Sequence, residues 1–446
     1  MHHRRTKIIA TVGPAQDPPG ELERLLDTGV DLLRVNLSHA APRDQAARVR
    51  RARAHRPDIA ILADLAGPKL RLADLPEEVR VKEGEALTLG AGGVPVGDPS
   101  LFDRVRAGDP IFIADGTIDL VVVDVRSDRV NCRVRGGGTL RSRKGINLPL
   151  DASSLPALTD KDRQDLADIG VLTPDFVAIS YVRHERDIAE ARALTDCQLI
   201  AKIEKQQALE RLDAIVEAAD AIMVARGDLG VEIPIERVPA MQKRIIRTAN
   251  RAGRPVITAT QMLVSMVTNP LPTRAEVTDV ANAVLDGTDA VMLSEETAVG
   301  HDPVGAVKMM IRLLVETEPL LQPHEGPRRS ESMNALAFAA AGLADDLGAA
   351  AIVVPTRTGV SAQKLAAFRP GRLILAYSRV PETTRRLHLT WGVRAIDLNV
   401  PAGSDPLHAT LEAARRDLPA GAHAVIFDIA PAGVTGVPSL VNAITF

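Results

Sequence analysis

Leu199-Ile200-Ala201-Lys202-Ile203-Glu204 is an apolar stretch that ends in a lysine and a glutamate two residues apart. Side chains alternate along a β-strand, so Lys202 and Glu204 point to the same face. Two charges on the inward face of an apolar strand are costly unless a metal, a ligand or each other offsets them. The stretch therefore predicts a buried strand whose end belongs to a functional site.

A second apolar strand, Ala221–Ala225, runs directly into Arg226-Gly227-Asp228. Glu204 and Asp228 can together hold a divalent cation through their carboxylate oxygens. Lys202 would then lie beside the cation as a positive point charge. This combination suits chemistry on a phosphate.

Short apolar runs recur along the whole chain, and most of the intervals between them have the length of a helix with two short loops. The runs are Lys7–Gly13, Leu32–Ser38, Ile59–Leu65, Phe176–Val182, Gln198–Glu204, Ala221–Gly227, Pro255–Gln261 and Ala290–Glu296. Eight such βα units predict a closed parallel (β/α)8 barrel of the TIM type, whose active site lies at the carboxyl ends of the strands.

Polar residues gather at those strand ends. They are Arg34, Asn36, Ser38, Asp64, Lys202, Glu204, Asp228, Thr260, Ser294 and Glu296. A single Ser, Thr or Asp at such a position is explained equally well as the cap of the following helix. Caps need neither a lysine nor an inward-facing arginine, so capping does not account for the set as a whole.

The remaining segments predict two further domains. Between the third and fourth strands the pattern turns to β-structure at Glu78–Leu89, Pro110–Val125 and Arg129–Val134. We expect a barrel formed by residues 1–71 and 144–324, and an inserted small β-barrel at 72–143 that is placed to act as a lid. Residues 325–446 read as a compact C-terminal α/β domain.

Composition excludes several classes of protein. The chain has 446 residues, of which 46% are hydrophobic and only 2% aromatic, as expected for parallel α/β cores built from small aliphatic side chains. The net charge of −3 shows no excess of basic residues of the kind that indicates binding to nucleic acid. Cys132 and Cys197 form no CxxC motif and read as reduced thiols. The sequence also shows no membrane-spanning run and no signal peptide, so we expect a cytoplasmic protein without a membrane partner.

No P-loop, HExxH or paired CxxC motif occurs, so a phosphate would be held by side chains and a metal. Arg34 can grip a phosphoryl group with two parallel hydrogen bonds, and Lys202 can neutralise its charge during transfer. A lysine at a barrel strand end can instead form a Schiff base, which requires a neutral amine. Glu204 disfavours that alternative because it stabilises the ammonium.

Long motifs stand in order along the chain: TKIIATVGP (6–14), LRVNLSH (33–39), KGINLP (144–149), IAKIE (200–204), MVARGDLG (223–230), ATQML (259–263) and PTRAE to DVANAV (272–284). Together they resemble the pyruvate kinase family over nearly the whole chain. The resemblance implies Mg²⁺-dependent (or Mn²⁺-dependent) phosphoryl transfer from phosphoenolpyruvate to ADP, giving pyruvate and ATP. It also implies that the C-terminal domain, residues 325–446, is regulatory, and that the protein is a homotetramer with an effector such as a sugar phosphate or AMP.

The resemblance also implies residue roles, matched motif by motif. Phosphoenolpyruvate would be held by Arg34, Lys202, Gly227, Asp228 and Thr260, and Mg²⁺ by Glu204 and Asp228. Contacts to the nucleotide would come from Asn36, Ser38, His39, Arg71 and Lys144. Thr260, with Ser294 and a water, would take part in protonating the enolate. The loop Thr356-Arg357-Thr358-Gly359-Val360-Ser361 would hold the phosphate of the effector, although a plain connecting turn explains that loop as well.

Three departures from the family pattern stand out. The family commonly has Thr-Lys-Gly-Pro-Glu after the third-strand aspartate, whereas Leu65-Ala66-Gly67-Pro68-Lys69 stands in this chain. Most members bind K⁺ at the positions of Asn36, Ser38, Asp64 and Leu65, so our hypothesis is that the Lys69 ammonium replaces K⁺. Glu295 stands where a glycine is usual, and residues 433–442 lack the usual Gly-Thr-Thr-Asn, which places the second wall of an effector site in doubt.

Two other functions fit parts of this pattern. A barrel aldolase or lyase acting on phosphoenolpyruvate would use the same metal and lysine, but not the lid or the nucleotide contacts at Arg71 and Lys144. A catalytically silent metabolite sensor would keep the fold, but would have no need to retain Arg34, Lys202 and Thr260 together.

Overall fold

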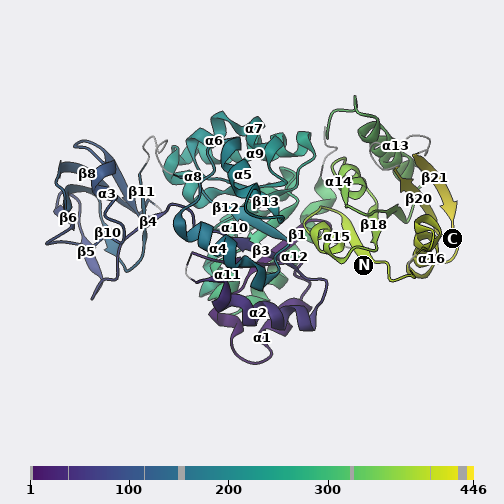
Figure 1. Ribbon diagram of the computed structural model, residues 1–446, viewed down its shortest axis with the longest axis horizontal. Helices are drawn as coiled ribbons and strands as arrows, with labels where there is room; N and C mark the ends of the chain where they lie inside the picture. The colour runs from purple at the N-terminus through teal and green to yellow at the C-terminus, as the bar shows by residue number, and fades with distance from the viewer. Residues whose placement is uncertain are drawn as a thin grey trace.

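Three bodies lie in a row in the computed structural model: an antiparallel β domain at one end, a closed parallel barrel in the middle and an α/β domain at the other end (Figure 1). The structure describes residues 4–38, 40–114, 116–148, 156–321, 326–401, 403–429 and 439–446. Within these ranges no helix combines the length and the apolar character that crossing a membrane requires.

The predicted eight-stranded barrel is confirmed, with the strands closing in the order β1-β16-β15-β14-β13-β12-β3-β2. Each strand is shorter than the apolar run that predicted it, because the polar residues at the end of the run leave the sheet and enter the loops. The strands are β1 (Lys7–Thr11), β2 (Leu32–Asn36), β3 (Ala60–Asp64), β12 (Phe176–Ile179), β13 (Gln198–Ile203), β14 (Ala221–Ala225), β15 (Val256–Ala259) and β16 (Ala290–Leu293).

Helices surround the barrel, and several begin with local caps. The hydroxyl of Thr273 accepts a hydrogen bond from the Glu276 amide while the Glu276 carboxylate accepts one from the Thr273 amide, which forms a capping box. The helices are α1 (Glu21–Asp27), α2 (Pro42–His55), α4 (Asp160–Asp168), α5 (Glu185–Arg192), α6 (Gln206–Glu210), α7 (Leu212–Ala218), α8 (Arg226–Glu232), α9 (Val238–Ala252), α10 (Arg274–Leu285), α11 (Glu295–Ala298) and α12 (Pro303–Thr317). Short 3₁₀ turns cover Pro14–Gln16, Ile169–Leu172, Ile235–Arg237, Val264–Val267 and Glu318–Leu320.

The barrel interior is packed with side chains and is not a pore. Ile9, Leu62, Phe176 and Met223 belong to one buried cluster inside the ring, and Leu389 of the C-terminal domain joins the same cluster. Since Leu389 comes from a separate domain, that domain closes one end of the barrel. The β domain projects from the opposite side (Figure 1).

The inserted domain forms a six-stranded antiparallel sheet in the order β4-β11-β7-β8-β9-β6 and a two-stranded ribbon, β10-β5. Its strands are β4 (Leu70–Arg71), β5 (Val79–Val81), β6 (Ala86–Gly90), β7 (Pro110–Ile113), β8 (Ile118–Val125), β9 (Arg129–Gly136), β10 (Gly138–Leu140) and β11 (Gly145–Asn147), with helix α3 (Leu101–Arg104). The pair β4 and β11 lies where the chain leaves and re-enters the barrel, so these two strands form the connection, called the hinge below, between the inserted domain and the barrel.

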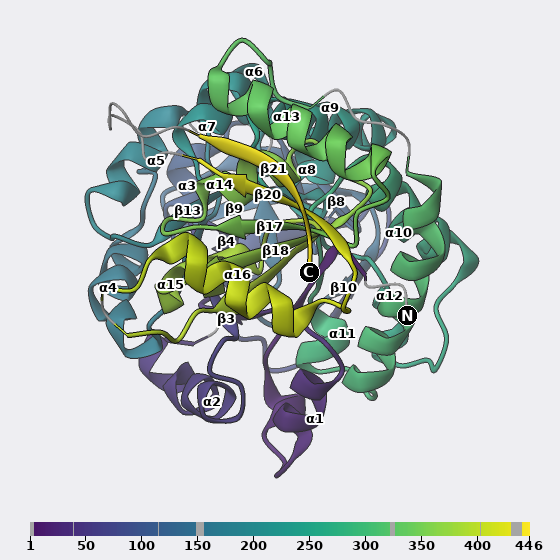
Figure 2. The ribbon, with the colours of Figure 1, turned by 90° about the vertical axis from the view of Figure 1, so that its right-hand side faces the viewer.

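The C-terminal domain is a five-stranded sheet in the order β19-β18-β17-β20-β21, with helices on both faces (Figure 2). Its strands are β17 (Ala351–Pro355), β18 (Leu373–Ser378), β19 (Val393–Asp397), β20 (His423–Asp428) and the antiparallel edge strand β21 (Leu440–Thr445). Its helices are α13 (Ser332–Asp346), α14 (Val360–Ala366), α15 (Pro381–Leu387) and α16 (Pro406–Asp417). The core on one face of the sheet includes α13 and α14, and the core on the other face includes α16.

Buried ion pairs and an aromatic ring join this domain to the barrel. The Trp391 indole is only 2% exposed, and its ring centroid lies 5.4 Å from the guanidinium of Arg5 and 4.9 Å from that of Arg369. Arg369 also forms an ion pair of 2.9 Å with Asp289, and Asp289 caps the amide of Val256 at the start of β15. The interface is therefore fixed to the barrel strands themselves.

Candidate active site

Lys202 is the centre of a charge cluster at the carboxyl end of β13. Its ammonium lies 2.9 Å from Glu204 and 3.2 Å from Asp64, and it donates a hydrogen bond of 2.8 Å to the Ser180 hydroxyl. The Glu204 and Asp64 side chains are about 1% exposed. The alternation of strand residues thus brings Lys202 and Glu204 together, as predicted.

Arg34 joins this cluster from β2. Its guanidinium lies 2.7 Å from Asp64 Oδ2 and also donates to the Thr11 hydroxyl at 3.1 Å. Asp64 is therefore shared between Arg34 and Lys202. Sharing one buried carboxylate holds the two cations near each other.

Asp228 lies in the first turn of α8, directly after β14. Its Oδ1 atom accepts two hydrogen bonds, one of 2.6 Å from the Lys69 ammonium and one of 3.1 Å from the Tyr181 hydroxyl. Tyr181 also donates its backbone amide to Glu204 Oε2 at 2.7 Å. Tyr181 thus connects the two carboxylates that were predicted to bind a divalent cation.

Thr260 follows β15 in the left-handed region of backbone conformation, with φ of 68°. Its hydroxyl accepts a hydrogen bond of 2.9 Å from the Gly227 amide, which places it against the first turn of α8. Arg226 holds this arrangement by donating to the Thr260 carbonyl at 2.6 Å and pairing with Asp279 at 2.7 Å. A threonine in this conformation costs about 1–3 kcal/mol, which the Arg226 contacts offset.

The residues present fit a divalent cation of the Mg²⁺ type. Glu204 and Asp228 supply hard oxygen donors, and Glu204 Oε1 is buried without a directed hydrogen bond even though the Lys202 ammonium lies near it. Among the described residues, no cluster of three or more His, Cys, Asp and Glu side chains could hold a metal. Mg²⁺ often keeps water and substrate oxygens among its ligands, so two carboxylates are sufficient.

Electrostatics favour the charged forms of Lys202 and Asp228. Burial by itself would lower the pKa of Lys202, but the carboxylates of Asp64 and Glu204 outweigh burial and hold that pKa above its ordinary value. Burial raises the pKa of Glu204, against the opposing effect of Lys202. Burial would also raise the pKa of Asp228, but Lys69 more than compensates and lowers it. A raised pKa of Lys202 disfavours a Schiff-base role, because that chemistry needs the neutral amine.

The other predicted residues are placed as follows. Asn36 accepts a hydrogen bond of 3.0 Å from the Ser38 amide, one strand away from Asp64. Ser294 directly precedes α11, and its amide donates to Glu296, while Glu295 is exposed. His39 lies outside the described residues.

Two predicted nucleotide contacts lie on the lid hinge. Arg71 ends β4 and donates a hydrogen bond of 3.1 Å to the Arg143 carbonyl. Lys144 directly precedes β11 and is exposed. Both therefore stand on the segment that connects the lid to the barrel mouth.

The effector-loop candidates lead into α14 through Gly359, which adopts a left-handed φ of 86°. The Thr356 hydroxyl accepts a hydrogen bond of 3.0 Å from the Gly359 amide, and the Arg357 carbonyl accepts one of 2.7 Å from Thr383. Thr358 and Ser361 flank this turn. Most of the segment 433–442 lies outside the described residues.

Sequence reasoning missed Ser180, Tyr181 and Arg226 as members of the site. The first two directly follow β12, and the third directly follows β14. Their position at the carboxyl ends of barrel strands was the available signal. No charged residue directly follows β12, so no site residue was predicted at that strand end.

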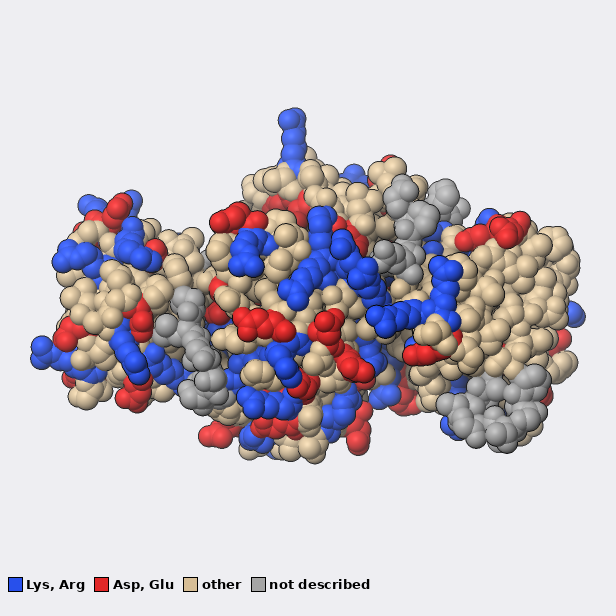
Figure 3. Space-filling view, turned by 90° about the horizontal axis from the view of Figure 1, so that it is seen from above, with Lys and Arg blue, Asp and Glu red and all other residues tan. Residues whose placement is uncertain are grey.

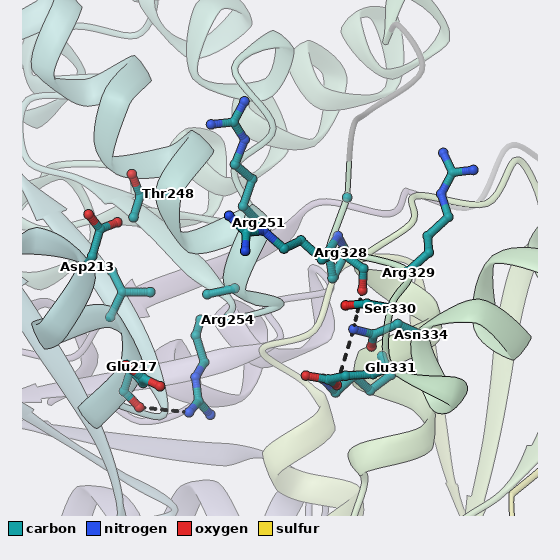
Figure 4. A pocket seen from close by; sticks show the side chains of 15 residues that line it. Asp213, Glu217, Thr248, Arg251, Arg254, Arg328, Arg329, Ser330, Glu331 and Asn334 are labelled. Carbon is teal, nitrogen blue, oxygen red and sulfur yellow. Dashed lines mark hydrogen bonds and ion pairs between the residues drawn. The ribbon is translucent and has the colours of Figure 1, made fainter.

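Other charged features lie away from this cluster. On the face in Figure 3, acidic and basic side chains are interspersed over the barrel. An open cleft of about 1280 Å³ lies between the barrel and the C-terminal domain (Figure 4) and contains none of the site residues named above. Its charged lining consists of Arg251, Arg254, Arg328, Arg329, Lys364, Asp213, Glu217 and Glu331.

Comparison with known proteins gives consistent matches. Residues 3–307 match the family model described as "Pyruvate kinase, barrel domain", and residues 334–436 match "Pyruvate kinase, alpha/beta domain". The chain is 40% identical to "Pyruvate kinase" of Methylorubrum extorquens, covering 98% of this chain and 97% of that protein. It is 42% identical to "Pyruvate kinase 2" of Synechocystis sp., covering 93% and 74%, and 44% identical to a "Pyruvate kinase" of Agrobacterium vitis, covering 88% and 86%.

Proposed function

The chain belongs to the pyruvate kinase family, a family of phosphotransferases, and we propose that its barrel mouth transfers a phosphoryl group from phosphoenolpyruvate to ADP. The observation that carries this proposal is the convergence of Lys202, Arg34 and two carboxylates at one end of the barrel. Cations so arranged can bind a phosphoryl group and neutralise its charge during transfer.

Glu204 and Asp228 would hold the divalent cation, Mg²⁺ or Mn²⁺. When bound, the cation polarises the phosphoryl and carboxylate oxygens of the substrate. Arg34 would bind the phosphoryl group through hydrogen bonds. Lys202 would lie beside that group as a protonated ammonium. The backbone at Gly227 and Asp228 would receive the carboxylate of the substrate at the start of α8.

Thr260 is proposed to contact the enol end of the substrate, and to take part with Ser294 and a water in protonating the enolate. The Thr260 hydroxyl accepts a hydrogen bond from the Gly227 amide. The same side chain can therefore lie close to both the carboxylate and the enol carbon of the substrate. Asn36, Ser38, His39, Arg71 and Lys144 would contact ADP. Closure of the lid would bring the hinge residues to the nucleotide and exclude water.

Lys69 is proposed to make the enzyme independent of K⁺. Its ammonium supplies the same +1 charge as the monovalent cation that most family members hold near Asn36, Ser38, Asp64 and Leu65. With tetramethylammonium as the only monovalent cation, the wild-type turnover rate should be near its maximum. A many-fold rise on adding K⁺ would reject this role.

Regulation and assembly are proposed along the lines of the family. The Thr356–Ser361 turn is a candidate site for the phosphate of a sugar phosphate or AMP, and the assembly is proposed to be a homotetramer. Activation curves with a panel of sugar phosphates and AMP, together with the mass in solution by light scattering, test these two points.

The decisive experiment follows pyruvate production from phosphoenolpyruvate with and without ADP. We expect strict dependence on ADP, whereas a lyase would release pyruvate without it. Lys202→Met should reduce turnover by several orders of magnitude, because the charge that faces the phosphoryl group is lost. Lys243→Met is a matched control, since Lys243 pairs with Asp286 on the outside of the barrel. Unchanged turnover in Lys202→Met would refute the role of Lys202.

A further inference from the structure

One ion pair at the barrel mouth crosses from the lid hinge to a proposed metal ligand. Lys69 directly precedes β4 of the hinge, and Asp228 belongs to α8 of the barrel. Their side chains, 2.6 Å apart, are only 16% and 19% exposed. The Lys69 ammonium therefore lies on Oδ1 of Asp228, one of the two oxygens with which this carboxylate could coordinate a divalent cation.

Packing at the hinge fixes the path of the Lys69 side chain. The side chain passes over Gly145, the first residue of β11, and a Cβ atom built at Gly145 would collide with Lys69 Cε. β4 and β11 pair with each other next to this point, with Leu70 opposite Ile146. The aliphatic part of Lys69 thus lies against both strands that connect the lid to the barrel.

We propose that Lys69 competes with the divalent cation for Asp228: its ammonium holds the carboxylate, and binding of the cation displaces it. This rests on the proposed role of Asp228 as a metal ligand. The displaced ammonium would then be free for the monovalent-cation role, so a single lysine would serve two positions in turn. Because Lys69 starts the hinge, metal occupancy and hinge packing become linked.

Binding of Mn²⁺, measured in the absence of substrates by the electron paramagnetic resonance signal of free Mn²⁺, tests the proposal without reference to turnover. Lys69→Met should bind Mn²⁺ about tenfold more tightly than wild type, as expected when one charged hydrogen bond no longer has to be broken. Arg143→Met is the matched control. Arg143 is a hinge cation that pairs with Asp74, not with Asp228, and its loss should leave Mn²⁺ affinity unchanged.

The Gly145→Ala variant distinguishes direct contact between Lys69 and Asp228 from a long-range effect of the Lys69 charge on Mn²⁺ binding. The added methyl group displaces the flexible end of Lys69 but keeps its charge in the hinge. Competition by contact predicts tighter Mn²⁺ binding in this variant also, whereas general electrostatic repulsion predicts no change. Equal or weaker binding in either Lys69→Met or Gly145→Ala would overturn the proposal.

Asp228→Asn distinguishes a failure of this inference from a failure of the proposed metal site. If Asp228 is a ligand, this variant loses most of its Mn²⁺ affinity. Retained Mn²⁺ affinity would instead show that Asp228 is not a metal ligand, and the proposed competition would then have no basis. Independence from K⁺ is read separately, from turnover in tetramethylammonium.

Discussion

Asp228 Oδ1 receives two hydrogen bonds whose expected effects on metal binding are opposite. Lys69 brings a positive charge that competes with a cation, whereas Tyr181 brings a neutral hydroxyl that fixes the orientation of the carboxylate. Burial, and next the charge of Asp228, raise the pKa of Tyr181 well above its ordinary value. The phenol therefore remains a donor throughout the working pH range.

Tyr181→Phe should weaken Mn²⁺ binding by about tenfold, because loss of a partner that orients a metal ligand typically costs 10–100-fold in affinity. The measurement is the same Mn²⁺ titration. Tyr377→Phe is a close control, since Tyr377 is the only other tyrosine and also bonds an aspartate, Asp417, in the C-terminal domain. Equal affinities for the two variants would show that Tyr181 does not position Asp228.

Among the elements of the structure, the turn that leaves β3 shows how a loop is fixed by packing. Gly67 has a φ of 67°, and a Cβ atom there would lie 2.7 Å from Ser180 Cβ and 2.9 Å from Tyr181 Cδ2. Ser180 in turn accepts from Lys202 and donates to the Leu65 carbonyl at 2.7 Å. The turn after β3 and the turn after β12 therefore hold each other in place beneath the charge cluster.

Gly67→Ala should destabilise the protein by more than about 2 kcal/mol and lower turnover, because it adds a steric clash to the cost of a left-handed alanine. Gly84→Ala is the matched control. Gly84 has a φ of 84° with nothing within 4 Å of an added Cβ, so only the backbone cost of about 1 kcal/mol remains. Urea unfolding measures both changes, and equal losses would contradict the packing argument.

The same elements show what could be predicted from the sequence. Apolar runs placed all eight barrel strands to within a few residues, and strand alternation placed Lys202 beside Glu204. The contact between Lys69 and Asp228 spans 159 residues and depends on the path over Gly145. Such a contact leaves no local pattern, so the sequence placed Lys69 near a cation site but not on Asp228. Tyr181 was missed for a related reason, since its role depends on a neighbouring strand.

At the scale of the whole molecule, a buried histidine makes docking of the C-terminal domain sensitive to pH. His388 Nε2 lies 3.6 Å from Asp58 of the barrel, in a hollow that also includes Lys7 and Asp31. Burial is the main cause that lowers the pKa of His388 to about 4, with Lys7 and Arg56 acting in the same direction and Asp31 and Asp58 opposing them. The folded protein therefore holds this histidine neutral.

The unfolded chain binds a proton on His388 near pH 6.5, whereas the folded protein binds it only near pH 4. Protonation therefore favours the unfolded chain as the pH falls below 6.5, and the full stability is present above pH 6.5. The contribution of His388 should fall by about 2 kcal/mol between pH 7.5 and pH 5. His388→Gln should remove this part of the pH dependence, as measured by urea unfolding at the two pH values. Identical pH dependence in wild type and variant would contradict the shifted pKa.

Trp391 stands at the same junction, in contact with two guanidinium groups, and it is the only tryptophan in the chain. Its intrinsic fluorescence consequently comes from one known place, the seam between catalytic and C-terminal domains. Separation of the domains would expose the indole to water and shift its emission to the red without disturbing the barrel mouth. An effector that loosens or tightens this seam could thus be detected optically, with no label attached.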